Sequence, residues 1–214
     1  MYTVKRKFAP IQKDKPRLQL ILASTSSYRA ALLAKLRLPF VQIDPEYTES
    51  AVTDESPTKM CERLARAKAA AVADQEPAAP WLIIGSDQVA HLDGEIFGKP
   101  GGFAAAHAQL SKCAGRCVTF ETGVALLSSE GHDIVSSERF DIRFRELTAD
   151  RITRYLNAEE PYDCAGSIKA EGLGITLLAE TRGRDVNTLL GLPLMLLQDL
   201  LAETGIDPLS NFNY

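Results

Sequence analysis

The sequence predicts an α/β fold in which helices flank a mixed, twisted β-sheet. Short apolar runs of the length of a buried strand alternate with segments of helical periodicity, a pattern typical of α/β proteins. Residues 18–36 form the first such pair, a strand followed by a tight loop and a helix. Residues 118–127 and 134–144 are long alternating segments joined by a short polar turn, which predicts an antiparallel pair.

Local signals define the elements of the first half of the chain. Residues 39–43 alternate as a strand does. Ser56 and Pro57 provide a cap and a first-turn proline for an alanine-rich helix that reaches about residue 74. The apolar segment 81–84 is predicted to be a second buried strand, and it is expected to end in a turn at residues 85–88.

The second half is assigned in the same way. Asp93 and Gly94 signal a hairpin turn, and Thr148 is a suitable helix cap. The pattern predicts helices at 103–114, 148–157 and 193–203, a short strand at 175–178, and a polar loop at 181–188.

Length and composition restrict the class of protein. A chain of 214 residues can form one sizeable domain, or one domain split into two lobes around a cleft. Its net charge of -4 argues against general coating of nucleic acid, which needs a basic surface. No apolar run approaches the roughly 20 residues of a membrane span. We therefore expect neither a nucleic-acid partner nor a membrane partner.

The N-terminal segment differs from the rest of the chain. Residues 1–17 carry six basic side chains and one acidic one, and they lack the apolar core of a secretory signal. We interpret them as a flexible basic tail that precedes a single α/β domain of residues 18–207. The four cysteines form no CxxC pair and, without an export signal, are expected to be reduced thiols. These observations predict a cytoplasmic protein.

The loop between the first strand and the first helix is rich in small hydroxyl residues. Ser26 is a suitable N-cap for the helix that follows. This geometry directs free backbone N–H groups and the positive end of the helix dipole at the loop. Ser24 and Arg29 add donors, so the segment predicts an anion site, with phosphate as the expected anion. The alternative is an ordinary capped helix after a strand.

Asp87 is a candidate for chemistry because it follows a buried strand. The ends of strands are where α/β sheets hold their sites. A carboxylate there can hold a divalent cation or take a proton from an attacking water. The alternative is a turn aspartate that binds its own backbone.

Three further side chains are candidates for binding a phosphate or a metal ion. Lys99 lies on a loop of small residues, and Lys68 lies on the helix that begins near residue 57. Glu49, in an irregular acidic connection, is a candidate metal ligand. Each of the three is also compatible with a solvated surface charge.

Five segments of the chain resemble, in the same order, motifs of the Maf family of nucleoside triphosphate pyrophosphatases. The segment LILASTSSYR is similar to that family's LxLASxSPRR motif. IGSDQV is similar to its GADT segment, and GEIFGKP to its DGxxxGKP segment. Residues 163–174 and 187–193 resemble two later blocks. The resemblance spans residues 18–205, and its specificity comes from the order of the five blocks.

This resemblance implies a fold of two lobes around a nucleotide-binding cleft, as in Maf and ITPase-like proteins. It implies cleavage of a nucleoside triphosphate between the α and β phosphates, which gives a nucleoside monophosphate and pyrophosphate. It also implies a divalent cation, Mg²⁺, Mn²⁺ or Co²⁺, as cofactor. Members of the family are often dimers, so a homodimer is compatible with the resemblance.

The resemblance also assigns roles by position. Asp87 becomes the proton acceptor that activates water. Phosphate binding falls to Ser24, Arg29, Lys68 and Lys99, and metal binding to Glu49 and Asp87. These assignments suit the chemistry, because phosphoanhydride hydrolysis mostly needs positioning and cations against developing charge.

The residues at three positions resemble those of the family branch that acts on 7-methyl-GTP. These residues are Tyr28, Gln88 and Glu171. Methylation at N7 leaves guanine cationic, so an aromatic face gains a cation–π term in addition to stacking. A carboxylate can accept hydrogen bonds from the guanine N1–H and N2–H donors. Uracil and thymine offer no such pair of donors. Tyr28 and Glu171 together therefore favour 7-methyl-GTP as substrate.

Two departures from the family pattern leave rival interpretations open. Ser27 stands where the family has proline, and Ala30 stands where many members have a second arginine. One rival is a dTTP or UTP pyrophosphatase, which arginine, threonine and glutamine at the three specificity positions would have favoured. The other is a protein that senses a nucleotide without turning it over.

Overall fold

The computed structural model describes residues 18–50, 52–78 and 80–211. The predicted tail, 1–17, lies outside the described residues. A seven-stranded sheet contains β1 Gln19–Ala23, β2 Phe40–Ile43, β3 Trp81–Leu92, β4 Glu95–Phe97, β5 Cys117–Ser128, β6 Asp133–Phe144 and β7 Leu178–Gly183. The α-helices are α1 Ser27–Ala34, α2 Pro57–Ala73, α3 Phe103–Cys113, α4 Ala149–Glu159 and α5 Leu194–Glu203. Short 3-10 helices occupy Ala165–Ser167, Leu173–Leu177, Val186–Thr188 and Pro208–Asn211.

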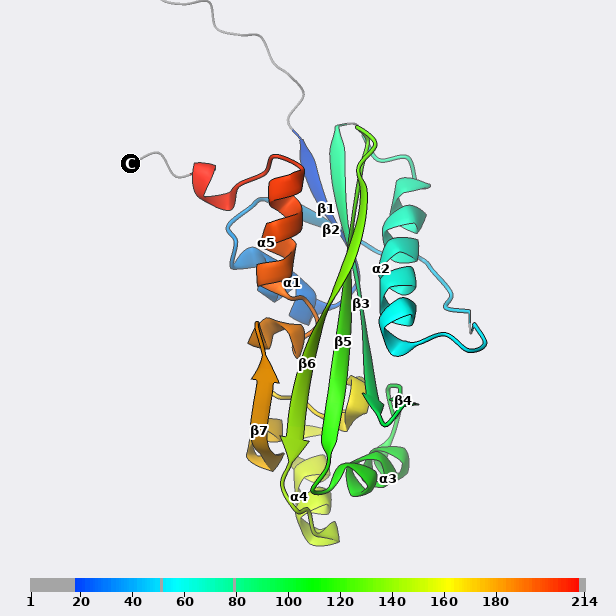
Figure 1. Ribbon diagram of the computed structural model, residues 1–214, viewed down its shortest axis with the longest axis vertical. Coiled ribbons are helices and arrows are strands. Elements are labelled where there is room, and N and C mark those ends of the chain that lie inside the picture. The colour runs from blue at the N-terminus through cyan, green and yellow to red at the C-terminus, as the bar shows by residue number, and fades with distance from the viewer. Residues whose placement is uncertain (1–17, 51, 79, 212–214) are drawn as a thin grey trace, which may run out of the picture.

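The sheet is mixed, as the sequence predicts. Its order is β2-β1-β3-β5-β6-β7, with β4 paired to β3. Strand β1 is parallel to both of its neighbours, whereas the remaining pairs are antiparallel. The long strands β3, β5 and β6 run through most of the length of the molecule (Figure 1).

One end of the sheet is covered on both faces. Alternate residues of the strands, such as Ile21 and Ile83, pack against α2 in one buried cluster. Their neighbours in sequence, such as Leu20 and Leu82, pack against α1 and α5 in another. This division follows from the two-residue period of a strand. Figure 1 shows α2 on one side of the strands and α1 with α5 on the other.

The other end of the sheet forms a second lobe. Phe120 and Phe140 on the long strands are buried with Leu110 of α3 and Leu156 of α4. Figure 1 shows α3 and α4 at this end, away from α1, α2 and α5. The chain thus has separate cores at the two ends of shared strands.

A gap in one edge of β3 lies between the two lobes. Strand β5 pairs with β3 along its other edge, from Leu82 to His91. On the first edge, β1 pairs with β3 as far as Gly85, and β4 pairs with it again only from Ala90. Within the described chain, residues 86–89 therefore have no neighbouring strand on this edge. The sheet is open to a ligand at this point.

The turn predicted at residues 85–88 is wrong. Strand β3 continues from Trp81 to Leu92, so Asp87 lies within the strand rather than after it. Gly85 permits a close approach of α2 instead of a turn, since a Cβ at Gly85 would lie 2.0 Å from the carbonyl oxygen of Ala65. Pairing with β5 holds this segment extended.

The strand predicted at 175–178 is also misplaced. Residues Leu173–Leu177 form a 3-10 helix, and the strand is Leu178–Gly183, within the segment assigned partly to a polar loop. The strand forms because β6 offers an edge, with Ile142 opposite Thr181. The polar character of this segment reflects its exposed position at the end of the sheet order.

Three predicted helix caps are confirmed. Ser26, Ser56 and Thr148 cap their helices by accepting hydrogen bonds from the backbone N–H three residues ahead. The four cysteines are free thiols. Among the described residues, no helix is long and apolar enough to span a membrane.

Candidate active site

A cleft of about 700 Å³ opens at the gap in β3. The structure brings all nine residues singled out in the sequence to its walls. They are Ser24, Tyr28, Arg29, Glu49, Lys68, Asp87, Gln88, Lys99 and Glu171. These residues come from the first strand–loop–helix unit, the acidic connection, α2, β3 and two later loops.

Lys68 joins the two candidate acidic groups. Its Nζ donates to Asp87 Oδ1 at 2.5 Å and to Glu49 Oε1 at 2.8 Å. Asp87 is buried and Lys68 is partly buried, whereas the side chain of Glu49 is about half exposed. Two carboxylates from distant parts of the sequence therefore converge on one point of the cleft.

Burial has the largest effect on the pKa of Asp87. Loss of water around the carboxylate raises the pKa of Asp87, although the positive charges of Lys68 and Arg29 act in the opposite direction. Glu49 adds to the increase in the pKa of Asp87 through charge repulsion. A carboxylate of raised pKa is a better proton acceptor than an exposed aspartate.

Arg29 lies at the start of α1, next to the loop predicted to bind phosphate. Its Nε donates to the carbonyl oxygen of Gly191 at 2.9 Å, and its Nη1 lies 3.5 Å from Ser24 Oγ. Burial lowers the pKa of Arg29, while Asp87 and Glu49 act in the opposite direction. An arginine retains its charge under such a shift, because its ordinary pKa exceeds 12.

Ser24 organises the same loop. The side chain is buried, and its Oγ accepts a hydrogen bond from the backbone N–H of Ser26 at 3.1 Å. Ser26 in turn caps α1. The loop therefore places a buried hydroxyl and a guanidinium beside the N-terminus of a helix, where an anion is favoured.

Tyr28 and Glu171 lie on the wall of the same cleft and are both exposed. Lys169 Nζ lies 6.0 Å from the centre of the Tyr28 ring and 3.3 Å from Glu159. The carboxylate of Glu159 balances the charge of this lysine. Lys99 also lines the cleft and is exposed.

The side chain of Gln88 is engaged by the protein. Its Nε2 donates to the carbonyl oxygen of Thr188 at 2.7 Å, and it lies 3.3 Å from that of Leu189. It also donates to Thr122 Oγ1 at 3.1 Å. Although Gln88 lines the cleft, its amide nitrogen is used to hold the loop opposite β3.

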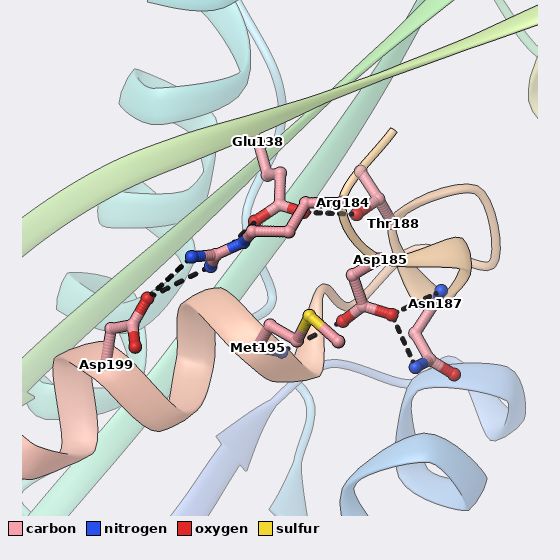
Figure 2. A network of polar contacts seen from close by, with 7 residues as sticks. All are labelled: Glu138, Arg184, Asp185, Asn187, Thr188, Met195 and Asp199. Atoms are coloured by element: carbon pink, nitrogen blue, oxygen red, sulfur yellow. Dashed lines mark hydrogen bonds and ion pairs between the residues drawn. The ribbon is translucent and has the colours of Figure 1, made fainter. Parts of the chain in front are cut away.

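This loop, residues 184–191, is the part of the site that the sequence does not reveal. Figure 2 shows its polar contacts. Arg184 bridges Glu138 and Asp199, with a distance of 3.0 Å to each. Asp185 is buried and accepts hydrogen bonds from the backbone N–H groups of Asn187 and Met195 at 2.8 and 2.9 Å.

Sequence reasoning assigns these residues no role. Residues 187–193 carry a family resemblance, but the contact between Arg29 and Gly191 joins positions 162 apart. Tyr47 and Met60 also line the cleft and were not singled out. An aromatic residue in an acidic connection is the only signal that could have indicated Tyr47.

The site is suited to a polyanion that brings a metal ion with it. Arg29, Lys68 and Lys99 supply positive charge along one cleft, and Asp87 and Glu49 supply carboxylate oxygens. The described residues contain no cluster of three or more histidine, cysteine or acidic side chains that could hold a metal ion. Two carboxylates with phosphate oxygens from a ligand are nevertheless a common shell for Mg²⁺.

Comparisons with known proteins place the chain in a family. Residues 19–204 match the family model described as Maf-like protein. A 7-methyl-GTP pyrophosphatase from Pseudomonas fluorescens is 52% identical over 190 residues, which cover 88% of this chain and 98% of the relative. One from Idiomarina loihiensis is 48% identical over 194 residues, or 90% of this chain and 98% of the relative.

A solved structure is similar at a greater distance. The crystal structure of a nucleoside-triphosphatase / dITP/XTP pyrophosphatase from Mycobacterium abscessus is 21% identical, with a TM-score of 0.40. The match covers 60% of this chain and 75% of that one. The family match extends over most of the chain and over nearly the whole length of the relatives. The chain belongs to the family of Maf-like proteins.

Proposed function

We propose that this protein hydrolyses 7-methyl-GTP to 7-methyl-GMP and pyrophosphate. The observation that carries the proposal is the convergence, in one cleft, of a buried aspartate, three cationic side chains and an aromatic–acidic pair. Relatives named 7-methyl-GTP pyrophosphatase, about half identical over nearly their whole length, support the choice of substrate.

The triphosphate is proposed to lie along the cationic wall. Arg29 and Ser24 at the start of α1 bind one end through the guanidinium, the hydroxyl and the helix N-terminus. Lys99 is exposed, and its long flexible side chain is proposed to reach an outer phosphate as a point charge. Lys68 leaves one or both carboxylates to bind phosphate oxygen when the ligand enters.

Asp87 and Glu49 are the residues proposed to hold a divalent cation. Both carboxylates lie next to Lys68 Nζ, with Asp87 Oδ1 at 2.5 Å and Glu49 Oε1 at 2.8 Å from it. The donor set consists of oxygen atoms alone, which suits Mg²⁺ or Mn²⁺. When bound, such a cation neutralises negative charge on the phosphates.

Asp87 is proposed to take the proton from the attacking water. Its raised pKa increases the basicity of the carboxylate, and its burial keeps bulk water from competing for it. Lys68 holds the carboxylate in place before the substrate binds. Arg29 stabilises the negative charge that develops on the phosphate oxygens.

The base is proposed to lie between Tyr28 and Glu171. The ring of Tyr28 is exposed and available for stacking on a cationic 7-methylguanine. The carboxylate of Glu171 is proposed to accept from the N1–H and N2–H groups. Gln88 contributes to this end of the cleft chiefly by holding the loop at Thr188.

The experiment that tests the proposal is pyrophosphate release from a nucleotide panel. We expect the highest kcat/KM with 7-methyl-GTP among 7-methyl-GTP, GTP, UTP, dTTP and CTP, each tested with Mg²⁺, Mn²⁺ and Co²⁺. Release of inorganic phosphate in place of pyrophosphate would contradict the assigned bond. A preference for UTP or dTTP would leave the reaction intact and reject the roles of Tyr28 and Glu171.

Nucleotide binding without turnover would instead identify a sensor. In that case the melting temperature would rise with nucleotide while no pyrophosphate appeared. Ala30 and Ser27, which depart from the family motif, would then be the first positions to restore.

Replacing Tyr28 with leucine is expected to reduce the preference for 7-methyl-GTP over GTP by roughly 2- to 5-fold. The estimate follows from a cation–π contribution of about 0.5–1 kcal/mol for an exposed ring. The matched control is Tyr28→Phe, which keeps the aromatic face. The measurement is the ratio of kcat/KM for the two nucleotides, and an equal ratio in Tyr28→Leu and wild type would reject stacking on Tyr28.

We also propose that the protein acts in the cytoplasm. Its four cysteines are free, and Cys61 and Cys113 are buried, which fits a reducing compartment. Homodimer formation remains a prediction from the family resemblance, and analytical ultracentrifugation would test it.

A further inference from the structure

Near the gap, side chains on the two faces of β3 contact different parts of the protein. Asp87 points to the face covered by α2, where it contacts Lys68. Ser86 and Gln88 therefore point to the opposite face. There, both side chains donate hydrogen bonds to backbone carbonyl groups of residues 188–191.

The carbonyl oxygen of Gly191 is the point where this loop meets the phosphate-binding segment. Ser86 Oγ donates to it at 3.0 Å, and Arg29 Nε donates to it at 2.9 Å. A carbonyl oxygen has two lone pairs, so these two donors use its full capacity. Ser86 is completely buried, and its hydroxyl does not reach solvent.

The rest of the loop is held independently. Thr122 Oγ1 and Gln88 Nε2 both donate to the carbonyl oxygen of Thr188, at 3.0 and 2.7 Å. Thr188 Oγ1 lies 3.4 Å from Glu138, which also binds Arg184 (Figure 2). Because these contacts anchor the loop before Gly191, loss of the Ser86 hydroxyl is expected to release the Gly191 carbonyl without unfolding the loop.

The hydrogen bond from Arg29 Nε to the carbonyl oxygen of Gly191 sets the orientation of the whole guanidinium group. The group is planar and its N–H donors form a rigid fork. Fixing Nε on Gly191 therefore fixes the directions of both Nη groups, one of which lies 3.5 Å from Ser24. A carbonyl that moves would turn the whole fork away from the phosphate position.

We propose that Ser86 is a positioning residue for Arg29, acting through the carbonyl oxygen of Gly191. The inference rests on the proposed function, since it assigns Arg29 to phosphate binding. Ser86 does not touch the substrate. Its hydroxyl holds the acceptor that orients the guanidinium, and so it governs affinity for the polyphosphate part of the ligand.

The test is the affinity of purified variants for inorganic pyrophosphate in the presence of Mg²⁺, measured by calorimetry. Ser86→Ala is expected to weaken binding roughly five-fold, the effect of one net hydrogen bond. The KM for 7-methyl-GTP should rise by a similar factor, while the preference for 7-methyl-GTP over GTP stays at the wild-type value.

A double-mutant cycle with Arg29→Lys separates positioning from a purely structural role. Lysine keeps the charge and lacks the fork. If Ser86 acts through the guanidinium, Ser86→Ala should cost little in the Arg29→Lys background. An equal fold-loss in both backgrounds would overturn the proposal, as would wild-type affinity in Ser86→Ala or the absence of pyrophosphate binding to the wild type.

Thr119→Val is the matched control. Thr119 is another buried hydroxyl of the same sheet, and it donates to Asp141 at 2.7 Å, away from the loop. We expect it to lower stability and leave the affinity for pyrophosphate unchanged. An equal loss of affinity in Thr119→Val would show that the Ser86 effect is non-specific. Failure of the wild type to turn over any nucleotide would reject the proposed function. The affinities of wild type and Ser86→Ala for pyrophosphate would still test the positioning role of Ser86.

Discussion

Replacing Asp87 with asparagine is expected to reduce pyrophosphate release by roughly 10²–10⁴-fold, because a proton acceptor typically contributes that much to a rate. Asparagine keeps the size of the side chain and can still accept a hydrogen bond from Lys68, but it cannot take a proton. The measurement is kcat on 7-methyl-GTP, with Asp150→Asn as control. Asp150 is exposed on α4 and does not line the cleft, and its pairing with Arg154 is local.

The same substitution is expected to stabilise the metal-free fold at neutral pH. The pKa of Asp87 is raised in the folded protein, so the ionised form is less favourable there than in the unfolded chain. Ionised Asp87 therefore costs stability above its folded pKa, and this cost disappears as the pH falls below its unfolded value of about 3.9. The melting temperature of Asp87→Asn relative to wild type should be higher at pH 7, and the difference should shrink in acid.

These two readouts distinguish a functional group from a structural one. A variant that loses both activity and stability would indicate that Asp87 mainly supports the fold through Lys68. A variant that keeps wild-type turnover would remove Asp87 from the chemistry altogether. Thermal melts in the presence of a chelator, from pH 4 to pH 8, are sufficient to decide.

Replacing Gly85 with alanine is expected to destabilise the fold by about 3 kcal/mol or more. A Cβ at this position would lie 2.0 Å from the carbonyl oxygen of Ala65 and 3.0 Å from the Cβ of Ala69. The first overlap is with backbone, so no side-chain rotation relieves it, and α2 must move away from the sheet. Overpacking of a buried contact usually costs 1–3 kcal/mol, and an overlap of this size exceeds the usual case.

Urea denaturation gives the measurement, with Gly98→Ala as the matched control. A Cβ at Gly98 would meet nothing within 4 Å, so we expect a change of no more than about 0.5 kcal/mol there. An unchanged midpoint for Gly85→Ala would show that α2 does not pack against β3 as closely as the structure has it. Because α2 carries Lys68, a displaced helix should also weaken nucleotide binding.

The sequence predicts those parts of the structure that depend on local signals. The first strand–loop–helix unit, its cap at Ser26 and the proline start of α2 depend on residues within a few positions of one another. They are found as predicted. The turn expected at Gly85 failed because the sequence alone does not show whether a glycine serves a turn or a close helix contact.

In the candidate site too, the identity of the residues could be predicted from the sequence, whereas their tertiary contacts could not. The nine chosen residues line one cleft. Seven of them lie within the five motifs, whereas Glu49 and Lys68 lie outside the motifs and were assigned by position. The hydrogen-bond partners of the nine residues could not be predicted from the sequence. The bond from Arg29 to Gly191 and the use of the Gln88 amide by the loop at Thr188 both require knowledge of which segments meet across the sheet.

The uninterrupted strands also bear on how the two lobes move. Hinge closure around a ligand needs a few connecting residues that can absorb large changes in φ and ψ. Here β3 and β5 cross from one lobe to the other while paired to each other from Leu82 to His91, so bending between the lobes would shear a ladder of hydrogen bonds. We therefore expect the two lobes to move little relative to each other, and a ligand to enter and leave by rearrangement of side chains and loops at the rim of the cleft. Amide exchange at the β3 positions that are hydrogen-bonded to β5 should accordingly be slow both with and without ligand.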